Sequence, residues 1–233
     1  MSQQKNPKFS IIIPHYDGSV VDERFERGIQ CLIDQEFKDF EVLIYHDGPI
    51  TRPIPEIYKN LNQLRFLKVT NKRYNDWGHS LRDIGIRESQ GDYIVHFNPD
   101  NILYPNALKE INNLIEDDTY IMLKGDTGSG KVSILGSNNI IIFPIIMIGH
   151  YRWGLENITG TRIKKDTKHG IILTGDPVQW ANIDCMQLVM KRQLWLNYGG
   201  WYDKQETSDG FMYPRFVKDY PARLCNKVLG EHW

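Results

Sequence analysis

Three cysteines are all that this 233-residue chain contains, an odd number without the spacing of a metal site. We therefore expect Cys31, Cys185 and Cys225 to be reduced core thiols of an intracellular protein. The opening residues lack the apolar segment of a secretory signal, so a cytoplasmic location is expected. The most apolar run, residues 140–148, is interrupted by Pro144. It is too short to span a bilayer, so we expect no transmembrane segment and one or two core strands instead.

An excess of charge of either sign is also missing. The chain has 28 basic and 29 acidic residues, which give a formal net charge of -1. This balance argues against nucleic acid as the main partner. Hydrophobic residues make up 41% of the chain, an ordinary fraction for a globular core. We expect a single domain over residues 1–233.

A phosphate-binding loop is suggested, and then excluded, by the glycine-rich residues Gly125 to Lys131. Their glycine and lysine spacing fits a P-loop, but that motif next needs Ser or Thr for magnesium, and residue 132 is Val. It also needs a helix after the loop, whereas residues 132–135 are strand-like. A hairpin turn explains the glycines better.

Strands and helices alternate over the first hundred residues. Apolar and β-branched runs predict strands at 9–13, 41–45, 65–69 and 93–97. Apolar residues at helical spacing predict helices at about 21–33, 57–64 and 77–88. Further on we expect a helix over 103–115, strands near 120–123, 132–135 and 186–190, and a last helix from Phe211 that Pro214 limits to one turn or kinks. The alternation specifies a parallel sheet with right-handed crossovers.

Polar side chains follow three of these strands, at the point where each strand ends. They are Tyr16 and Asp17, His46 and Asp47, and Asp100. The carboxyl ends of parallel strands meet at one edge of the sheet, where open α/β sheets bind ligands. Asp100 considered alone is equally well explained as the cap of the next helix. Three strand-end carboxylates on one edge favour a binding site.

Five segments, taken in order, resemble the inverting family 2 glycosyltransferases of the GT-A fold. They are FSIIIP at 9–14, QEFKDFEV at 35–42, HDGP at 46–49, LRDIGI at 81–86 and GDYI at 91–94. The resemblance is good over residues 9–101 and weaker over 180–220. It implies an α/β GT-A fold with a mostly parallel central sheet flanked by helices. Residues 1–101 would be the nucleotide-sugar-binding half and 102–233 the acceptor and catalytic-base half. The implied reaction moves a sugar from a nucleotide-diphosphate sugar to a saccharide or glycan acceptor, with inversion.

The resemblance also implies the residues of a donor pocket. Asp47 would accept a hydrogen bond from the base, which makes UDP the favoured nucleotide. Arg82 would lie near the base or the diphosphate. The nucleotide pocket would further be lined by Pro14, His15, Tyr16 and Asp17.

The stretch Asn98-Pro99-Asp100 falls on the family's Asp-x-Asp metal motif. Asp100 would hold Mn²⁺ or Mg²⁺, both of which accept oxygen ligands and share them with phosphates. Asn98 departs from the family's Asp and brings no charge, so one clear carboxylate remains. His232 is a candidate extra ligand.

On the acceptor side, the resemblance places Asp184 near the acceptor and Asp209 as the general base, with Glu206 as the second candidate. Asp209 is open to a competing interpretation as a helix cap, because Ser-Asp-Gly is good capping chemistry. Candidate sugar platforms are the tryptophans Trp77, Trp153, Trp180 and Trp201, although core packing is the more ordinary role for each.

Two alternative functions remain, and one segment has two possible roles. A sugar nucleotidyltransferase would need a glycine-rich loop with Arg or Lys directly after the first strand, where this chain has His15-Tyr16-Asp17. A non-catalytic nucleotide- or sugar-binding module is kept open by Asn98. The basic run at 164–169 is expected to be a solvated loop, with a loop that closes over a phosphorylated ligand as the alternative.

Overall fold

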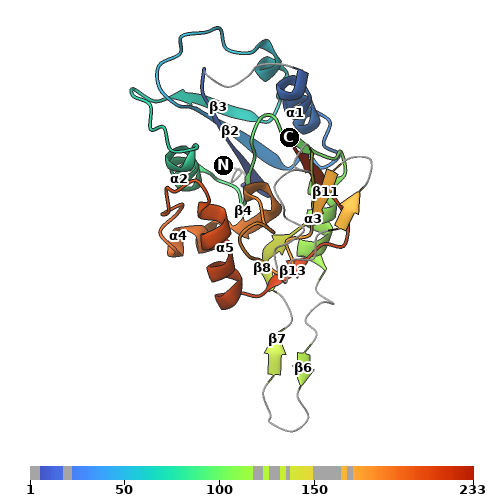
Figure 1. The fold of residues 1–233 in the computed structure, drawn as a ribbon. Helices are drawn as coiled ribbons and strands as arrows, with labels where there is room; N and C mark the ends of the chain where they lie inside the picture. Colours follow the sequence, from blue (N-terminus) through green and yellow to red (C-terminus); the bar gives the residue numbers. More distant parts are fainter. Residues whose placement is uncertain are drawn as a thin grey trace, which may run out of the picture.

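The computed structural model describes residues 6–17, 23–117, 123–125, 132–134, 137–148, 164–166 and 170–233. Within them, a seven-stranded sheet of order β13-β8-β12-β4-β1-β2-β3 forms the centre of the molecule (Figure 1). Its strands are β1 (Phe9–His15), β2 (Phe40–His46), β3 (Leu64–Val69), β4 (Tyr93–His96), β8 (Ser137–Ile142), β12 (Leu188–Lys191) and β13 (Ala222–Leu224). β12 runs antiparallel to both of its neighbours, and the other pairs are parallel. The expectation of a mostly parallel sheet is confirmed.

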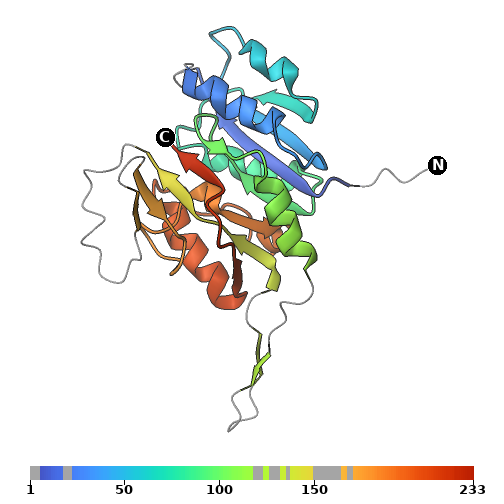
Figure 2. The same cartoon turned by 90° about the vertical axis from the view of Figure 1, so that its right-hand side faces the viewer.

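A second sheet lies beside the first and carries part of the site (Figure 2). Its order is β10-β11-β9-β14-β5, with β5 (Ile102–Leu103), β9 (Ile145–Met147), β10 (Lys164–Asp166), β11 (Gly170–Leu173) and β14 (Gly230–His232). The apolar run 140–148 forms two strand pieces on either side of Pro144, and they belong to different sheets. Residues 164–166 were expected in a loop but pair with β11, so that expectation is wrong for them.

Helices cover both faces of the central sheet. Successive side chains of a strand point to opposite faces, so the apolar residues of β1 pack against helices on each side. On one face, β1 residues Ile11 and Ile13 pack with α1 (Glu23–Ile33) and α3 (Ala107–Glu116). On the other face, Ile12 packs with α2 (His79–Glu88), α4 (Arg192–Asn197) and α5 (Ser208–Asp219). The short 3₁₀ helices η1 (Glu56–Asn60) and η4 (Cys185–Gln187) complete the described helices. None of these helices combines the length and apolar character needed to cross a bilayer.

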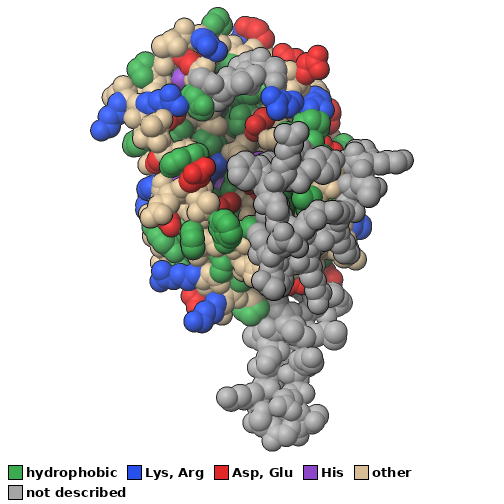
Figure 3. Space-filling model, in the orientation of Figure 1, with side chains coloured by type: hydrophobic (Ala, Val, Ile, Leu, Met, Phe, Trp, Pro, Cys, Tyr) green, Lys and Arg blue, Asp and Glu red, His purple; other side chains and the backbone are tan. Residues whose placement is uncertain are grey.

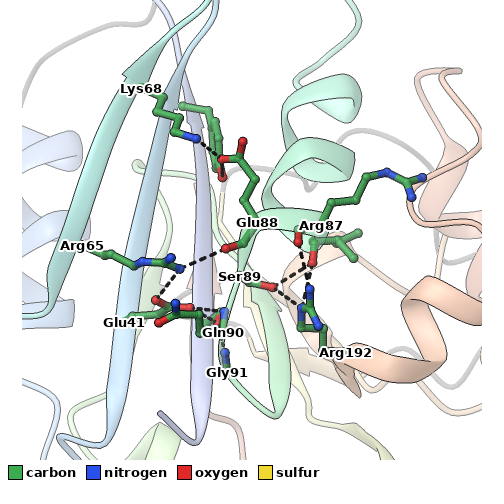
Figure 4. A network of polar contacts seen from close by, with 12 residues as sticks. Glu41, Arg65, Lys68, Arg87, Glu88, Ser89, Gln90, Gly91 and Arg192 are labelled. Carbon is green, nitrogen blue, oxygen red and sulfur yellow. Dashed lines mark hydrogen bonds and ion pairs between the residues drawn. The ribbon is translucent and has the colours of Figure 1, made fainter. Parts of the chain in front are cut away.

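The amino edge of the sheet is closed by a polar network (Figure 4). Glu41 at the start of β2 accepts hydrogen bonds from Ser10 Oγ (2.6 Å), Gln90 N (2.6 Å) and Arg65 Nη1 (3.1 Å). Arg65 Nη1 also donates to the Glu88 carbonyl at the end of α2 (3.0 Å). These contacts fix α2 against β1–β3 and leave the opposite, carboxyl edge free for ligands.

Two local expectations change, and a third is confirmed. α3 begins at Ala107, because residues 102–103 form β5 rather than a helical turn. α5 continues through Pro214 as far as Asp219, so the proline does not confine it to one turn. β6 (Leu123–Gly125) and β7 (Val132–Ile134) pair antiparallel, which confirms a hairpin in place of a P-loop. Predictions for residues 120–122, 126–131 and 167–169 lie outside the described residues. The three cysteines are buried and form no disulfide.

Candidate active site

A cavity of about 830 Å³ lies at the carboxyl edge of the sheet. It is lined by residues at the ends of β1, β2 and β4, at the starts of α2, η4 and α5, and in β14. The predicted site residues that line it are Pro14, His15, Tyr16, Asp47, Arg82, Asn98, Pro99, Asp100, Asp184, Glu206, Asp209 and His232. The structure therefore brings most of the predicted residues together. Asp17, Trp180 and Trp201 are not among the lining residues.

Asp47 and Tyr16 form the end of the cavity beside β1 and β2. Asp47 accepts hydrogen bonds from the backbone N–H groups of Tyr74 (2.8 Å) and Asn75 (3.2 Å), so it holds the loop after β3. The Arg73 guanidinium lies 4.2 Å from the centre of the Tyr16 ring. An aromatic face, a carboxylate and a cation thus lie together at this end of the cavity.

Asp17 serves a different purpose, one position further along. Its carboxylate accepts hydrogen bonds from Thr51 N, Thr51 Oγ1 (2.6 Å) and His46 Nε2 (2.8 Å). The hydrogen bonds from Thr51 hold the pKa of Asp17 well below its usual value, although partial burial opposes them. Asp17 therefore ties the end of β1 to the loop after β2.

The turn that carries the metal motif, Asn98 to Asn101, packs closely against α1. Asn101 N donates to the Asn98 carbonyl (3.0 Å), which closes the turn from Asn98 to Asn101. A Cβ on Gly28 would lie 2.0 Å from the Pro99 carbonyl oxygen, so only glycine allows this approach. The next elements are β5 and then α3, whose N-cap is Asn106. The interpretation of Asp100 as a helix cap is therefore wrong.

Arg82 is buried at the bottom of the cavity and pairs with the residue that departs from the family motif. Its Nη2 donates to Asn98 Oδ1 at 2.6 Å. Its Nε and Nη1 are buried and have no hydrogen-bond partner among the described residues. The amide of Asn98 leaves the positive charge of Arg82 uncompensated at this contact.

Asp184 and His232 form a half-buried pair beside Asp100. His232 Nδ1 lies 3.1 Å from Asp184 Oδ2. Although burial acts against it, the negative charge of Asp184 raises the pKa of His232. Burial alone would raise the pKa of Asp184, but the positive charge of His232 outweighs it and lowers that pKa. Burial, with Asp184 adding to it, raises the pKa of Asp100.

Asp209 lies in the first turn of α5, two residues after the N-cap Thr207, so it is not the cap itself. Its Oδ1 accepts a hydrogen bond from the Gly210 backbone N–H (2.8 Å). Burial and then the negative charge of Asp184 raise the pKa of Asp209 to about 7. A carboxyl group with this pKa can exchange protons near neutral pH, as a general base must. Glu206 lines the same cavity and is exposed.

The tryptophans divide into core and surface residues. Trp201 is fully buried, stacks on Trp195 and donates its indole N–H to Ser208 Oγ (2.9 Å). The prediction that Trp201 contacts an acceptor sugar is corrected accordingly, because both of its faces pack inside the protein. Trp180 and Trp77 are exposed by 53% and 60%. Trp153 lies outside the described residues.

The metal motif offers few donor atoms for the ion that it implies. Asn98 Oδ1 is engaged by Arg82, which leaves Asp100 as the available oxygen donor of the motif. Among the described residues, no three His, Cys, Asp or Glu side chains are grouped to hold a metal ion. Mg²⁺ typically binds through one or two carboxylates together with waters and substrate phosphates. The residues thus fit an ion that Asp100 shares with a diphosphate, not an ion held by the protein alone.

Arg73 and His79 are among the cavity residues that sequence reasoning missed. Arg73 follows the end of β3, so the strand-end argument used for Asp47 applies to it too. His79 opens α2, and burial followed by the positive charge of Arg82 lowers its pKa to about 4. No signal in the sequence distinguishes His79 from an ordinary helical residue.

The chain belongs to glycosyl transferase family 2, whose family model matches residues 10–174. An uncharacterized glycosyltransferase of Rickettsia bellii (strain RML369-C) is 29% identical over 153 residues, which cover 61% of this chain and 21% of that protein. A cholesterol galactosyltransferase of Borreliella burgdorferi is 25% identical over 48% of this chain and 30% of its own length. The chain thus spans less than a third of either relative. This membership does not support the nucleotidyltransferase alternative.

Solved structures show that the fold is GT-A. S. aureus TarS 1-349 in complex with UDP superposes with a TM-score of 0.65 at 12% identity, covering 97% of this chain and 60% of that one. The mannosyltransferase PcManGT from Pyrobaculum calidifontis, in complex with GDP-Man and Mn2+, gives a TM-score of 0.60 at 12% identity, covering 98% and 57%. The fold class expected from the sequence is confirmed.

Proposed function

We propose that this chain transfers a sugar from a UDP-sugar to a hydroxyl group of a saccharide acceptor, with inversion and with the help of Mn²⁺ or Mg²⁺. One observation carries the proposal. Asp209, a carboxyl group with a pKa of about 7, faces the same cavity as the metal-motif residue Asp100. A base for the acceptor and an anchor for the leaving diphosphate are therefore within one cavity.

The donor occupies the deeper part of the cavity. Tyr16 and Asp47 bind the uridine, and Arg82 donates its unpaired N–H groups to the sugar or the diphosphate. Asp100 would hold a divalent ion, which would supply positive charge to stabilise the leaving diphosphate. Solved neighbours support the donor class, because one TarS structure contains UDP and another contains UDP-GlcNAc.

Asp209 acts on the acceptor. Its carboxylate takes the proton from the acceptor hydroxyl while that oxygen forms a bond to the anomeric carbon. The bond from the anomeric carbon to the diphosphate oxygen breaks, and its electron pair leaves with UDP. Attack from the face opposite the leaving group inverts the anomeric centre. Asp184, paired with His232, keeps a negative charge beside Asp209 and so makes it a stronger base.

The test measures UDP binding and turnover separately. Calorimetry with UDP, with and without Mn²⁺, is run on the wild type and on Asp100→Ala, and hydrolysis of labelled UDP-glucose, UDP-galactose and UDP-GlcNAc is followed in parallel. We expect Mn²⁺ to strengthen UDP binding in the wild type and to have no effect in Asp100→Ala. Wild-type protein that binds no UDP under either condition would refute the proposal.

Asn98 also supports a second function, that of a binding module without catalysis. It removes half of the acidic pair expected at the metal motif. Metal-dependent UDP binding without hydrolysis of any of the three donors would select this second function.

A further inference from the structure

Two tryptophans stand out at the surface of the described chain. Trp77 and Trp180 are 60% and 53% exposed, whereas Trp195 and Trp201 are fully buried. A large exposed indole costs free energy in water, since its apolar faces remain hydrated. Two such side chains beside a candidate active site call for a ligand that covers them.

The backbone is in an unfavourable conformation at Trp77 and at the residue that follows Trp180. Within the described residues, the non-glycine residues with a left-handed φ are Asn75 (57°), Trp77 (54°) and Ala181 (65°). One is Trp77 itself, and Ala181 directly follows Trp180. Left-handed φ is unfavourable for residues with a side chain and tends to be retained at ligand-binding sites. Both indoles are therefore held in position by backbone that the surrounding structure enforces.

The loop that carries Trp77 is fixed on both sides. Before Trp77, the Asp47 carboxylate accepts hydrogen bonds from the N–H groups of Tyr74 and Asn75. After it, a Cβ on Gly78 would lie 2.6 Å from the Pro14 side chain, so the loop packs directly on the end of β1. Because the loop cannot withdraw, the indole stays at the rim of the cavity, which Trp77 lines.

The two tryptophans lie on either side of Asp209. The Trp77 ring is 6.4 Å from the His79 ring, and His79 Nε2 is 3.3 Å from Ser208 Oγ, the residue before Asp209. Trp180 packs on Gly210, the residue after Asp209, where an added Cβ would lie 2.9 Å from the Trp180 ring. The proposed base thus lies between one exposed indole at the start of α2 and another that packs on α5.

We infer that Trp77 and Trp180 are two sugar-binding platforms of the acceptor site, and that the acceptor is an oligosaccharide whose rings cover both. This inference rests on the function proposed above. The C–H face of a pyranose ring packs on an indole, while its hydroxyl groups remain hydrated at the rim. The donor fills the deep part of the cavity, so a ligand that covers the rim and presents a hydroxyl to Asp209 is the acceptor.

The test uses a glycan microarray that carries α- and β-linked oligosaccharides together with their monosaccharides. Labelled wild-type protein is applied with UDP and Mn²⁺, and compared with Trp77→Ala, Trp180→Ala and the control Tyr220→Ala. Tyr220 is also an exposed aromatic residue, 37% exposed, but it lies outside the cavity. We expect the wild type and the control to bind a subset of the oligosaccharides and no monosaccharide. Each tryptophan variant should lose at least tenfold in apparent affinity.

A fourth variant separates the indole from the fold. Glycine adopts the left-handed φ of residue 77 without strain, whereas alanine does not. Trp77→Gly should therefore melt at a higher temperature than Trp77→Ala, while both variants lose glycan binding to the same extent. Equal glycan binding by Trp77→Ala or Trp180→Ala and the wild type overturns the inference, as does a wild type that binds no oligosaccharide. Calorimetric titration of the same samples with UDP decides what has failed. Retained UDP binding confines the failure to the acceptor site, whereas lost UDP binding refutes the proposed function itself.

Discussion

Replacing Asp209 with asparagine should stabilise the folded protein above pH 7 and, at the same time, remove most of its turnover. Asparagine keeps an oxygen that can accept the hydrogen bond from Gly210 N, and it has nearly the same shape. What it lacks is the negative charge. Burial and the nearby Asp184 disfavour that charge, which is why the pKa of Asp209 is raised to about 7.

The magnitude follows from the difference between the two pKa values. An unfolded value of 3.8 and a folded value of about 7 correspond to about 4 kcal/mol, at about 1.4 kcal/mol per pH unit. Since the side chain is partly exposed, solvent screening reduces the expected effect to about 2–3 kcal/mol. At about 2–4 °C per kcal/mol for a chain of this size, the melting temperature should rise by roughly 5–10 °C.

The sign depends on which state holds the proton. Between about pH 4 and pH 7 the folded protein keeps Asp209 protonated, while the unfolded chain has lost that proton. Raising the pH through this window therefore destabilises the wild type, and above pH 7 the loss is constant. Asp209→Asn does not titrate and so escapes this loss. The two proteins should melt together near pH 4 and diverge up to pH 7.

The assay is thermal unfolding of both proteins from pH 4 to pH 9, in EDTA so that no metal contributes. The exposed Glu206→Gln serves as the matched control and should follow the wild type at every pH. A constant difference between Asp209→Asn and the wild type across the whole range would refute the assignment of the raised pKa to Asp209. Turnover of Asp209→Asn should fall by about 10² to 10⁴, as expected when a general base is lost, with UDP affinity unchanged.

Three further predictions test neighbours of this group. Asp184→Asn removes the charge that raises the pKa of Asp209, so the acidic limb of the pH–rate profile should move to lower pH; an unmoved limb would contradict the coupling. Gly28→Ala places a methyl group against the Pro99 carbonyl, so its free energy of unfolding in urea should fall by about 1–3 kcal/mol and its Mn²⁺-dependent UDP binding should weaken. An alanine substitution on the exposed face of α1 should change neither quantity. Asn98→Asp restores a second carboxylate and should tighten Mn²⁺ binding several-fold by calorimetry; unchanged affinity would show that residue 98 does not face the ion.

Sequence reasoning predicted which strand-end residues line the cavity because local rules govern them. Polar residues after β1, β2 and β4 had to meet at one edge once the strands were parallel, and the cavity lies there. The parallel sheet followed from the same alternation, and the GT-A fold from the resemblance of the five matching segments. These arguments need only the order of the strands and the residue at which each strand ends.

The acceptor side could not be predicted in the same way, because tertiary packing decides it. Trp201 and Trp180 are equivalent candidates by residue type, yet one is buried against Trp195 and the other is exposed. The pairing of His232 with Asp184 depends on β14 entering the second sheet beside β5 and β9. No periodicity in the sequence reveals such contacts between distant segments.

The position of β14 has a consequence for how the protein acquires its activity during synthesis. β1, β2, β3 and β4 are made early and pair with one another, so this part of the central sheet can assemble while the ribosome is still translating. The strand that carries His232 fills the place between β5 and β9, which are made more than 80 residues earlier. Until residue 232 has emerged, β5 and β9 have unpaired edges, and Asp184 lacks its cationic partner. If the proposed function holds, nucleotide binding should therefore arise on the nascent chain before transfer does, and the unfilled gap between these strands is where chaperone binding or misassembly would be concentrated.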